Sequence, residues 1–173
     1  MAITYSADLT IAMTANNLPS PNITSASAEN GAGWEAFRAF DHNETGNNKW
    51  LTPAATPTGW IKFDFGSTFY KVIRYTILIP DEATETNRAP KNWTFQGSNN
   101  DSNWDVLDTQ TNQAFANHER KTYSFSNPTS YRYYKLNVTA NNGNTNYLAI
   151  QEIQIMRDIT TKGGLGIGNP YIF

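Results

Sequence analysis

The chain contains no cysteine, and this absence excludes disulfide bonds, thiol catalysis and metal ligation by thiolates. Soft-metal sites would have to rest on His42 and His118, the only two histidines of the sequence. This argues against a structural zinc site of the usual cysteine–histidine type.

Charge is also scarce. Charged residues make up 16% of the chain, against about a quarter in an average globular protein, and the formal net charge is -2. No basic run occurs, so we expect no nucleic-acid partner. Long apolar runs and amphipathic membrane helices are also missing, so we expect no membrane insertion. Residues 1–8 contain no basic residue and no apolar core, so we expect no secretory signal peptide.

Aromatic residues, in contrast, are frequent, at 13% of 173 residues, which is enough chain and apolar surface for one domain with a core. Apolar residues alternate with polar ones in several short runs, and turn residues such as Asn-Gly and Asn-Pro separate these runs. The pattern predicts an all-β sandwich or barrel. The one helical candidate is short, over Trp34 to Phe40. The expected strands centre on residues 61–65, 75–79, 93–95, 134–138 and 153–155.

The segment from Ala39 to Trp50 is rich in side-chain oxygen atoms and is bounded by apolar residues. Hard cations such as Ca²⁺ bind six to eight oxygens from carboxylates, amides and carbonyls. The alternative interpretation is a solvated turn of Asn and Gly. The oxygen donors are Asp41, Asn43, Glu44, Thr45, Asn47 and Asn48.

Motifs for catalysis are missing. The sequence has no nucleophilic serine motif, no His-Glu-x-x-His and no phosphate-binding loop. His42 lies in the oxygen-rich loop and is a candidate ligand, although a loop histidine is more often simply exposed. The acidic residues outside strands are interpreted as solvated turn carboxylates. They are Glu44, Asp81, Glu82, Glu85, Asp101 and Asp105.

The end of the chain, Thr160 to Phe173, alternates glycines with apolar residues and finishes in an aromatic group. It is either a flexible tail or an arm that packs on a neighbouring subunit, and the apolar end favours the arm. Its glycine spacing does not match a dinucleotide-binding fingerprint.

Several motifs, in order, resemble the discoidin (coagulation factor 5/8 type C) domain from about Ser25 to Met156. Each motif is weak alone, but together they are specific. They are Ala39-Phe40-Asp41 through Trp50, Gly59-Trp60-Ile61-Lys62-Phe63-Asp64-Phe65-Gly66, Ala89-Pro90-Lys91-Asn92-Trp93, Asn103-Trp104, Tyr131-Arg132-Tyr133-Tyr134 and Ile150-Gln151-Glu152-Ile153.

The resemblance implies a galactose-binding-like jelly-roll β-sandwich, similar to carbohydrate-binding modules of family 32 type. It divides the chain into a lead-in strand packed on the sandwich (1–24), the discoidin-like sandwich (25–157) and a Gly-rich tail or docking arm (158–173). The family's tryptophan positions imply mostly core roles for Trp50, Trp60, Trp93 and Trp104.

The resemblance also implies a structural calcium ion. Its ligands would be the carbonyl of Arg38, Asp41, Asn43, Glu152 and the carbonyl of Gln151. Asn48 stands where the family has Thr, and Thr45 competes for that role. A carboxylate at Glu152, in an apolar strand, would be unfavourable without a cation.

For a sugar ligand, the resemblance points to Arg88 with Asn87, and to Tyr147 with Asn146, on neighbouring loops. Trp34 is a third candidate. Rings stack on the C–H faces of sugars, and polar side chains bind the hydroxyls. Leu51 stands where some galactose-binding members have His, which counts against galactose.

We therefore expect a non-enzymatic carbohydrate-binding module with a structural calcium. The missing signal peptide and the unusual tail suggest a component of a phage virion, in the tail or capsid, that assists adhesion to host-surface or mucus-like glycans. The expected location is thus virion or extracellular. A homo-oligomer or virion contact would use the C-terminal tail. The alternatives are a purely structural virion or assembly protein and the binding module of a secreted glycosidase.

Overall fold

Antiparallel strands and a single short 3-10 helix make up the computed structural model, which describes residues 2–82 and 84–160. The elements are β1 (Ile23–Ala26), η1 (Ala36–Ala39), β2 (Trp50–Leu51), β3 (Gly59–Asp64), β4 (Val72–Leu78), β5 (Pro90–Ser98), β6 (Asp105–Gln110), β7 (Arg120–Ser124), β8 (Tyr133–Asn141), β9 (Ala149–Ile150) and β10 (Glu152–Arg157).

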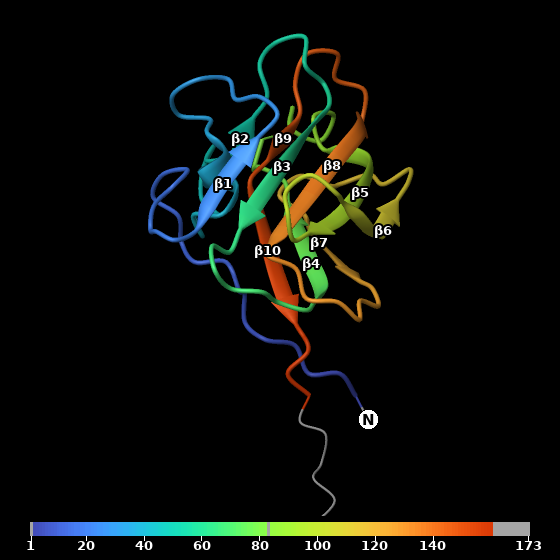
Figure 1. Cartoon of the computed structure of the whole chain (residues 1–173). Coiled ribbons are helices and arrows are strands. Elements are labelled where there is room, and N and C mark those ends of the chain that lie inside the picture. The colour runs from blue at the N-terminus through green and yellow to red at the C-terminus, as the bar shows by residue number, and fades with distance from the viewer. Residues whose placement is uncertain (1, 83, 161–173) are drawn as a thin grey trace, which may run out of the picture.

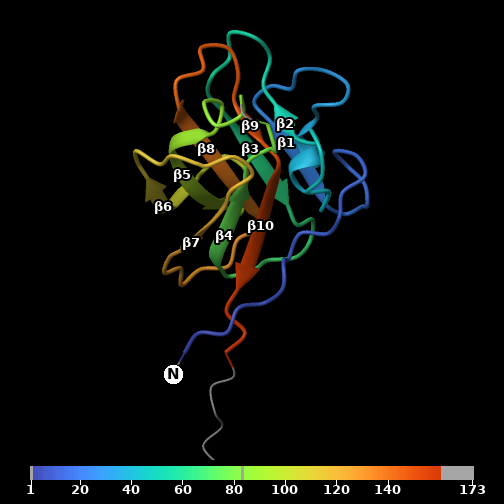
Figure 2. The ribbon, with the colours of Figure 1, turned by 180° about the vertical axis from the view of Figure 1, so that it is seen from behind.

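The strands form two packed sheets, and this arrangement confirms the predicted jelly-roll β-sandwich. A five-stranded sheet in the order β1-β3-β8-β5-β6 faces the viewer in Figure 1. A three-stranded sheet in the order β10-β4-β7 covers it and is seen from behind in Figure 2. β2 pairs with β9 as a separate two-stranded ribbon.

Alternation along the strands places the apolar residues between the sheets, as the sequence predicts. Ile61 and Phe63 of β3 are buried, whereas Lys62 between them is partly exposed. Tyr75 of β4 stacks on Phe95 of β5 with ring centroids 4.2 Å apart, which joins the two sheets at the centre of the core.

The four tryptophans expected in the core divide into two pairs. Trp50 and Trp93 are 0% and 1% exposed and belong to the core. Trp60 and Trp104 are only half-buried and line an outer surface groove instead. The core expectation for this second pair is wrong. Trp60 lies on the outward-facing set of β3 positions, and Trp104 lies in the loop before β6.

The lead-in residues pack along the edge of the three-stranded sheet. The amides of Ser6 and Leu9 donate to the carbonyls of Arg157 and Ile155 at 2.9 and 2.7 Å. This contact holds the lead-in beside the oxygen-rich loop, where the Thr10 hydroxyl lies 3.3 Å from His42 Nε2. The domain boundaries stay predictions. Of the expected tail or docking arm over residues 158–173, residues 161–173 lie outside the described residues.

Loops gather at one end of the sandwich, opposite the N-terminus. In Figure 1 the loops between β2 and β3 and between β8 and β9 lie at the top, and the N-terminus lies at the bottom. The predicted helical segment contains the 3-10 helix η1, which leads into the loop of residues 41–48. Over residues 2–82 and 84–160, no helix has the length and apolar character needed to cross a bilayer.

Candidate glycan and cation site

Arg88 and Tyr147, predicted from separate loops, meet in the structure. The guanidinium carbon of Arg88 lies 4.9 Å from the centroid of the Tyr147 ring. The backbone also joins the two loops, because the amide of Ala149 donates to the carbonyl of Arg88 at 3.1 Å. The pair therefore presents a ring and a planar cation side by side.

The buried carboxylate of Glu85 holds Arg88, and so the pair, in place. Its Oε1 accepts from Arg88 Nη1 at 2.6 Å and from Lys49 Nζ at 2.9 Å. Lys49 is itself buried and lies 5.1 Å from the centroid of the Trp34 ring. Lys49 and Glu85 thus connect Trp34 to Arg88, which in turn stacks on Tyr147.

Glu85 is 0% exposed, so its interpretation as a solvated turn carboxylate is wrong. Two cations compensate its charge, which is the condition for burying a carboxylate. Lys49 and Glu85 were not predicted as site residues. No local signal identifies them, because their pairing joins positions 36 residues apart.

The amides of the two loops that carry Arg88 and Tyr147 extend the same surface. Asn144 Nδ2 donates to Asn87 Oδ1 at 3.0 Å, which ties these loops together. Asn87 and Asn146 are exposed. Trp34 and Tyr147 are half-buried, so part of each side chain remains available to a ligand.

In the oxygen-rich loop, four oxygen atoms converge on one amide group. Asn48 Nδ2 lies 3.2 Å from Arg38 O, 3.0 and 3.1 Å from the two carboxylate oxygens of Asp41, and 3.1 Å from Asn43 O. Arg38 Nη1 fixes the orientation of this amide by donating to Asn48 Oδ1 at 2.9 Å. The NH₂ group therefore occupies the meeting point of these oxygens.

Thr45, the alternative to Asn48 in the predicted calcium site, bonds to the Asn43 side chain instead. Its amide and hydroxyl both donate to Asn43 Oδ1, at 3.1 and 2.7 Å. Asn48 rather than Thr45 therefore lies against the converging oxygens. Asn43 contributes its carbonyl to them, while its side chain forms the turn.

Glu152, predicted from the other end of the sequence, lies beside this loop. It is 0% exposed, and neither of its carboxylate oxygens has a hydrogen-bond partner among the described residues. Burial, and then the nearby Asp41 and Asp8 carboxylates, raise the pKa of Glu152 to about 9. Burial likewise raises the pKa of Asp41.

Its neighbour Gln151 is also fully buried. Gln151 lies between β9 and β10, and its Nε2 donates to Gly46 O at 3.3 Å, so this junction is in direct contact with the loop. Gln151 Oε1 is buried without a partner among the described residues. The structure thus brings Glu152 and Gln151 to the loop, as the ligand set requires.

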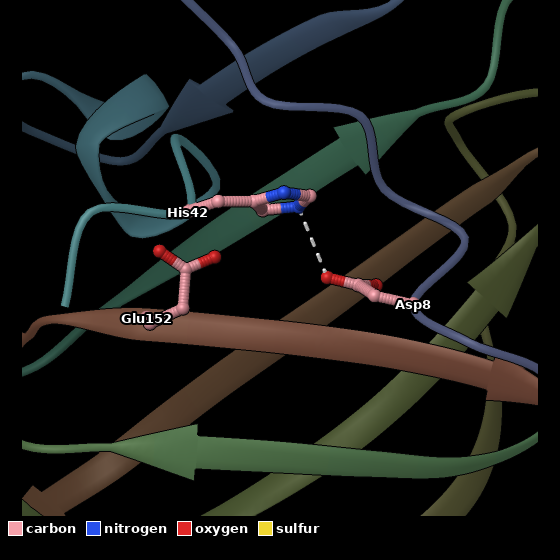
Figure 3. Close-up of side chains that lie close together, drawn as sticks. All are labelled: Asp8, His42 and Glu152. Atoms are coloured by element: carbon pink, nitrogen blue, oxygen red, sulfur yellow. Dashed lines mark ion pairs between the residues drawn. The ribbon is translucent and has the colours of Figure 1, made fainter.

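A histidine and a second aspartate complete the surroundings of Glu152. His42 Nε2 lies 3.2 Å from Asp8 Oδ2 of the lead-in. Figure 3 shows the His42 ring and the Glu152 carboxylate on the same side of β10, with Asp8 beside them. Asp8 was not predicted, because nothing in the lead-in's sequence signals its contact with β10.

This sandwich with its loop site matches a known family. The F5/8 type C domain model matches residues 22–153. The chain belongs to the F5/8 type C domain family. The predicted family is therefore confirmed.

Solved structures show the same fold at low sequence identity. Chitosan-binding module 1 of a chitosanase/glucanase from Paenibacillus sp. IK-5 has a TM-score of 0.65 and 20% identity, over 87% of this chain and 98% of that module. A family 32 module from Clostridium perfringens, in complex with GalNAc-β-1,3-galactose, has a TM-score of 0.63 and 20% identity, over 78% and 94% of the two chains.

One curated relative is a larger enzyme. The peptide-N(4)-(N-acetyl-β-glucosaminyl)asparagine amidase of Arabidopsis thaliana is 34% identical over 96 residues, which are 54% of this chain. The match spans only 13% of the length of that amidase.

Proposed function

We propose that this F5/8 type C domain is a non-enzymatic carbohydrate-binding module. Its glycan site is formed by Arg88 and Tyr147, with Trp34, Asn87 and Asn146 around them. The observation that carries the proposal is the stacking of Arg88 on Tyr147 at 4.9 Å over the buried carboxylate of Glu85.

The chemistry of this surface suits a sugar. The guanidinium is planar, and the anchor at Glu85 holds it in one orientation. Its Nε is buried, so the terminal N–H groups that Glu85 leaves free are the ones that can donate to hydroxyls, with little loss of entropy. The Tyr147 and Trp34 rings offer apolar faces for C–H groups. The exposed amides of Asn87 and Asn146 can both donate and accept.

We further propose that a structural calcium ion holds the neighbouring loop. The donors would be Arg38 O, Asp41, Asn43 O, Asn48, the carbonyl of Gln151 and, from β10, Glu152. The residues present fit such an ion, because four oxygens already converge on the Asn48 NH₂ group. Rotation of this amide, with loss of its hydrogen bond from Arg38, would present Asn48 Oδ1 to the cation, and the buried Glu152 would gain a counter-charge.

The experiment for the glycan site is calorimetric titration with soluble oligosaccharides, including chitooligosaccharides and GalNAc-β-1,3-galactose. The parent chain is compared with Arg88→Ala and with Arg157→Ala. Arg157 is a matched control, because its guanidinium lies 5.8 Å from the Tyr70 ring near the opposite end of the sandwich. We expect Arg88→Ala to lose binding and Arg157→Ala to retain it. Equal affinity in both variants would refute the site.

The biological setting stays a prediction. A virion component and a module of a secreted glycosidase both use glycan binding, and the relatives named above include modules of larger enzymes. A purely structural virion or assembly role would instead bury Arg88 and Tyr147 in a subunit contact. A stable oligomer that protects these two residues, with no glycan binding, would favour that alternative.

A further inference from the structure

A histidine and two carboxylates converge beside β10 from three separate segments. They are Asp8 from the lead-in, His42 from the loop after η1, and Glu152 at the start of β10. One potential ligand atom from each lies within 4.8 Å of the other two. Figure 3 shows that the imidazole and the two carboxylates border the same space.

Glu152 supplies the observation that points to a ligand. Its carboxylate is excluded from solvent, and both oxygens lack a hydrogen-bond partner among the described residues. A buried polar group in this state is unfavourable unless a partner arrives. The nearby carboxylates of Asp8 and Asp41 make a cation the appropriate partner.

Asp8 is already oriented toward the shared space. Its Oδ1 accepts from the amides of Ile155 and Thr10 at 2.9 and 3.0 Å, and its Oδ2 accepts from the Thr10 hydroxyl at 2.7 Å. These bonds fix the carboxylate, with Oδ2 facing His42 Nε2. Such outer contacts orient metal ligands and raise affinity.

We propose that Asp8, His42 and Glu152 form a binding site for a divalent transition metal of the zinc type. An imidazole nitrogen with two carboxylates suits zinc, cobalt or nickel, whereas calcium prefers oxygen ligands alone. Three protein ligands leave a coordination position open for water or a ligand group. No cysteine is needed for such a site.

Metal binding requires the three ligand side chains to move slightly closer together. Ligands of a tetrahedral zinc ion, bound at about 2.0–2.1 Å, lie about 3.3 Å apart. The three ligand atoms lie within 4.8 Å of one another, and His42 Nε2 and Asp8 Oδ2 are already 3.2 Å apart, so only small side-chain movements are needed around the metal. His42 is the ligand able to move, because its side chain is 38% exposed.

This site shares Glu152 with the calcium proposal but has different partners. The other calcium donors are Arg38 O, Asp41, Asn43 O, Asn48 and the carbonyl of Gln151, none of which belongs to the three zinc ligands. Asp41→Ala therefore tests calcium, and His42→Ala tests the transition metal. Neither result depends on whether the loops bind a glycan.

The test is calorimetric titration of zinc chloride into the full chain, free of affinity tag and stripped with EDTA, supported by the visible spectrum of the cobalt(II) form. We expect one zinc per chain. We expect His42→Ala and Asp8→Asn each to weaken binding by about tenfold or more and to change the cobalt spectrum. His118→Ala, the matched control, removes the other half-exposed histidine, which lies 3.7 Å from Asp81, and should leave binding unchanged.

Because Glu152 is buried, a substitution there can disturb folding. The zinc site is therefore tested with His42→Ala instead. Asp41→Ala should keep zinc binding even where it loses calcium. A parent chain that binds no zinc would overturn the proposal. So would His42→Ala with unchanged zinc affinity, or zinc binding that disappears in Asp41→Ala alone, since the metal would then lie among the loop oxygens.

Discussion

The ammonium of Lys49 lies 2.9 Å from Glu85 Oε1, and neither side chain is more than 1% exposed. The same oxygen accepts from Arg88 at 2.6 Å. The buried Glu85 carboxylate thus neutralises Lys49, and it also fixes the Arg88 guanidinium at the proposed glycan surface. Stability and binding are therefore linked at Glu85.

Substitution Glu85→Ala should lower the free energy of unfolding by about 3–5 kcal/mol, because it removes the only buried carboxylate that the described residues place against the buried Lys49 charge. It should also weaken glycan binding by releasing Arg88. Urea denaturation and calorimetric titration measure the two effects. Glu82→Ala is the control: Glu82 lies 4.0 Å from the same ammonium but is 40% exposed, so we expect a loss below about 1 kcal/mol. Similar losses in both variants would contradict the assigned anchor.

The ring of Tyr147 gives a second prediction. Tyr147→Ala should weaken glycan binding by about tenfold, or ~1.4 kcal/mol, through loss of the stacking face. Tyr147→Phe should bind nearly as well, because it keeps the ring. Tyr5→Ala serves as control, since Arg74 also stacks on Tyr5. Loss of binding in the Phe variant as well would assign the contact to the hydroxyl instead of the ring.

Calcium should stabilise the folded chain by mass action. At a free concentration of 100 times Kd, the gain is about 2.7 kcal/mol. For a chain of this size, this raises Tm by about 5–10 °C. Differential scanning calorimetry with calcium and with EDTA measures the shift, and Asp41→Ala should abolish it. An unchanged Tm in the parent chain would exclude the calcium site.

The buried Tyr134 hydroxyl should make the free energy of unfolding decrease at alkaline pH. Its hydroxyl donates to Tyr70 O at 2.5 Å and accepts from Val72 N at 3.2 Å, and burial raises its pKa to about 12. Between pH 10 and 12 the unfolded chain ionises this group while the folded chain keeps it protonated. The free energy of unfolding should therefore be unaffected by Tyr134 below about pH 10 and fall by about 2–3 kcal/mol above it.

Urea denaturation from pH 9 to 12 tests this decline, with Tyr134→Phe as comparison. The Phe variant should be less stable at pH 9 but decline less steeply above pH 10. Tyr75 and Tyr123 have pKa values raised in the same direction by burial, so some decline remains. Parallel curves for the two proteins would contradict a raised pKa at Tyr134.

The strands with clear alternation were predictable, because period-2 burial is a local property of residues such as Ile61 and Phe63. The short strands β2 and β9 were not, since two residues carry no period. β6 and β7 were also missed, because several of their residues are exposed or charged. The half-exposed Trp60 shows that aromatic content alone does not predict which face of a strand a residue occupies.

The site was predictable in part. Arg88, Tyr147 and the Asp41 loop came from motifs that resemble the family, and the structure brings Arg88 to Tyr147 and Glu152 to the loop. Lys49, Glu85 and Asp8 were not predictable, because each acts through a partner distant in sequence. Asp8 and Glu152, for example, are 144 positions apart by their numbers in the chain.

Glycan binding at Arg88 is tested most directly by a glycan array probed with the full chain, in calcium and in EDTA, beside Arg88→Ala. We expect binding to at least one glycan class, loss of that signal in Arg88→Ala, and a weaker signal in EDTA. A correctly folded parent chain that binds no glycan would contradict glycan binding at Arg88, as would a signal that Arg88→Ala leaves unchanged.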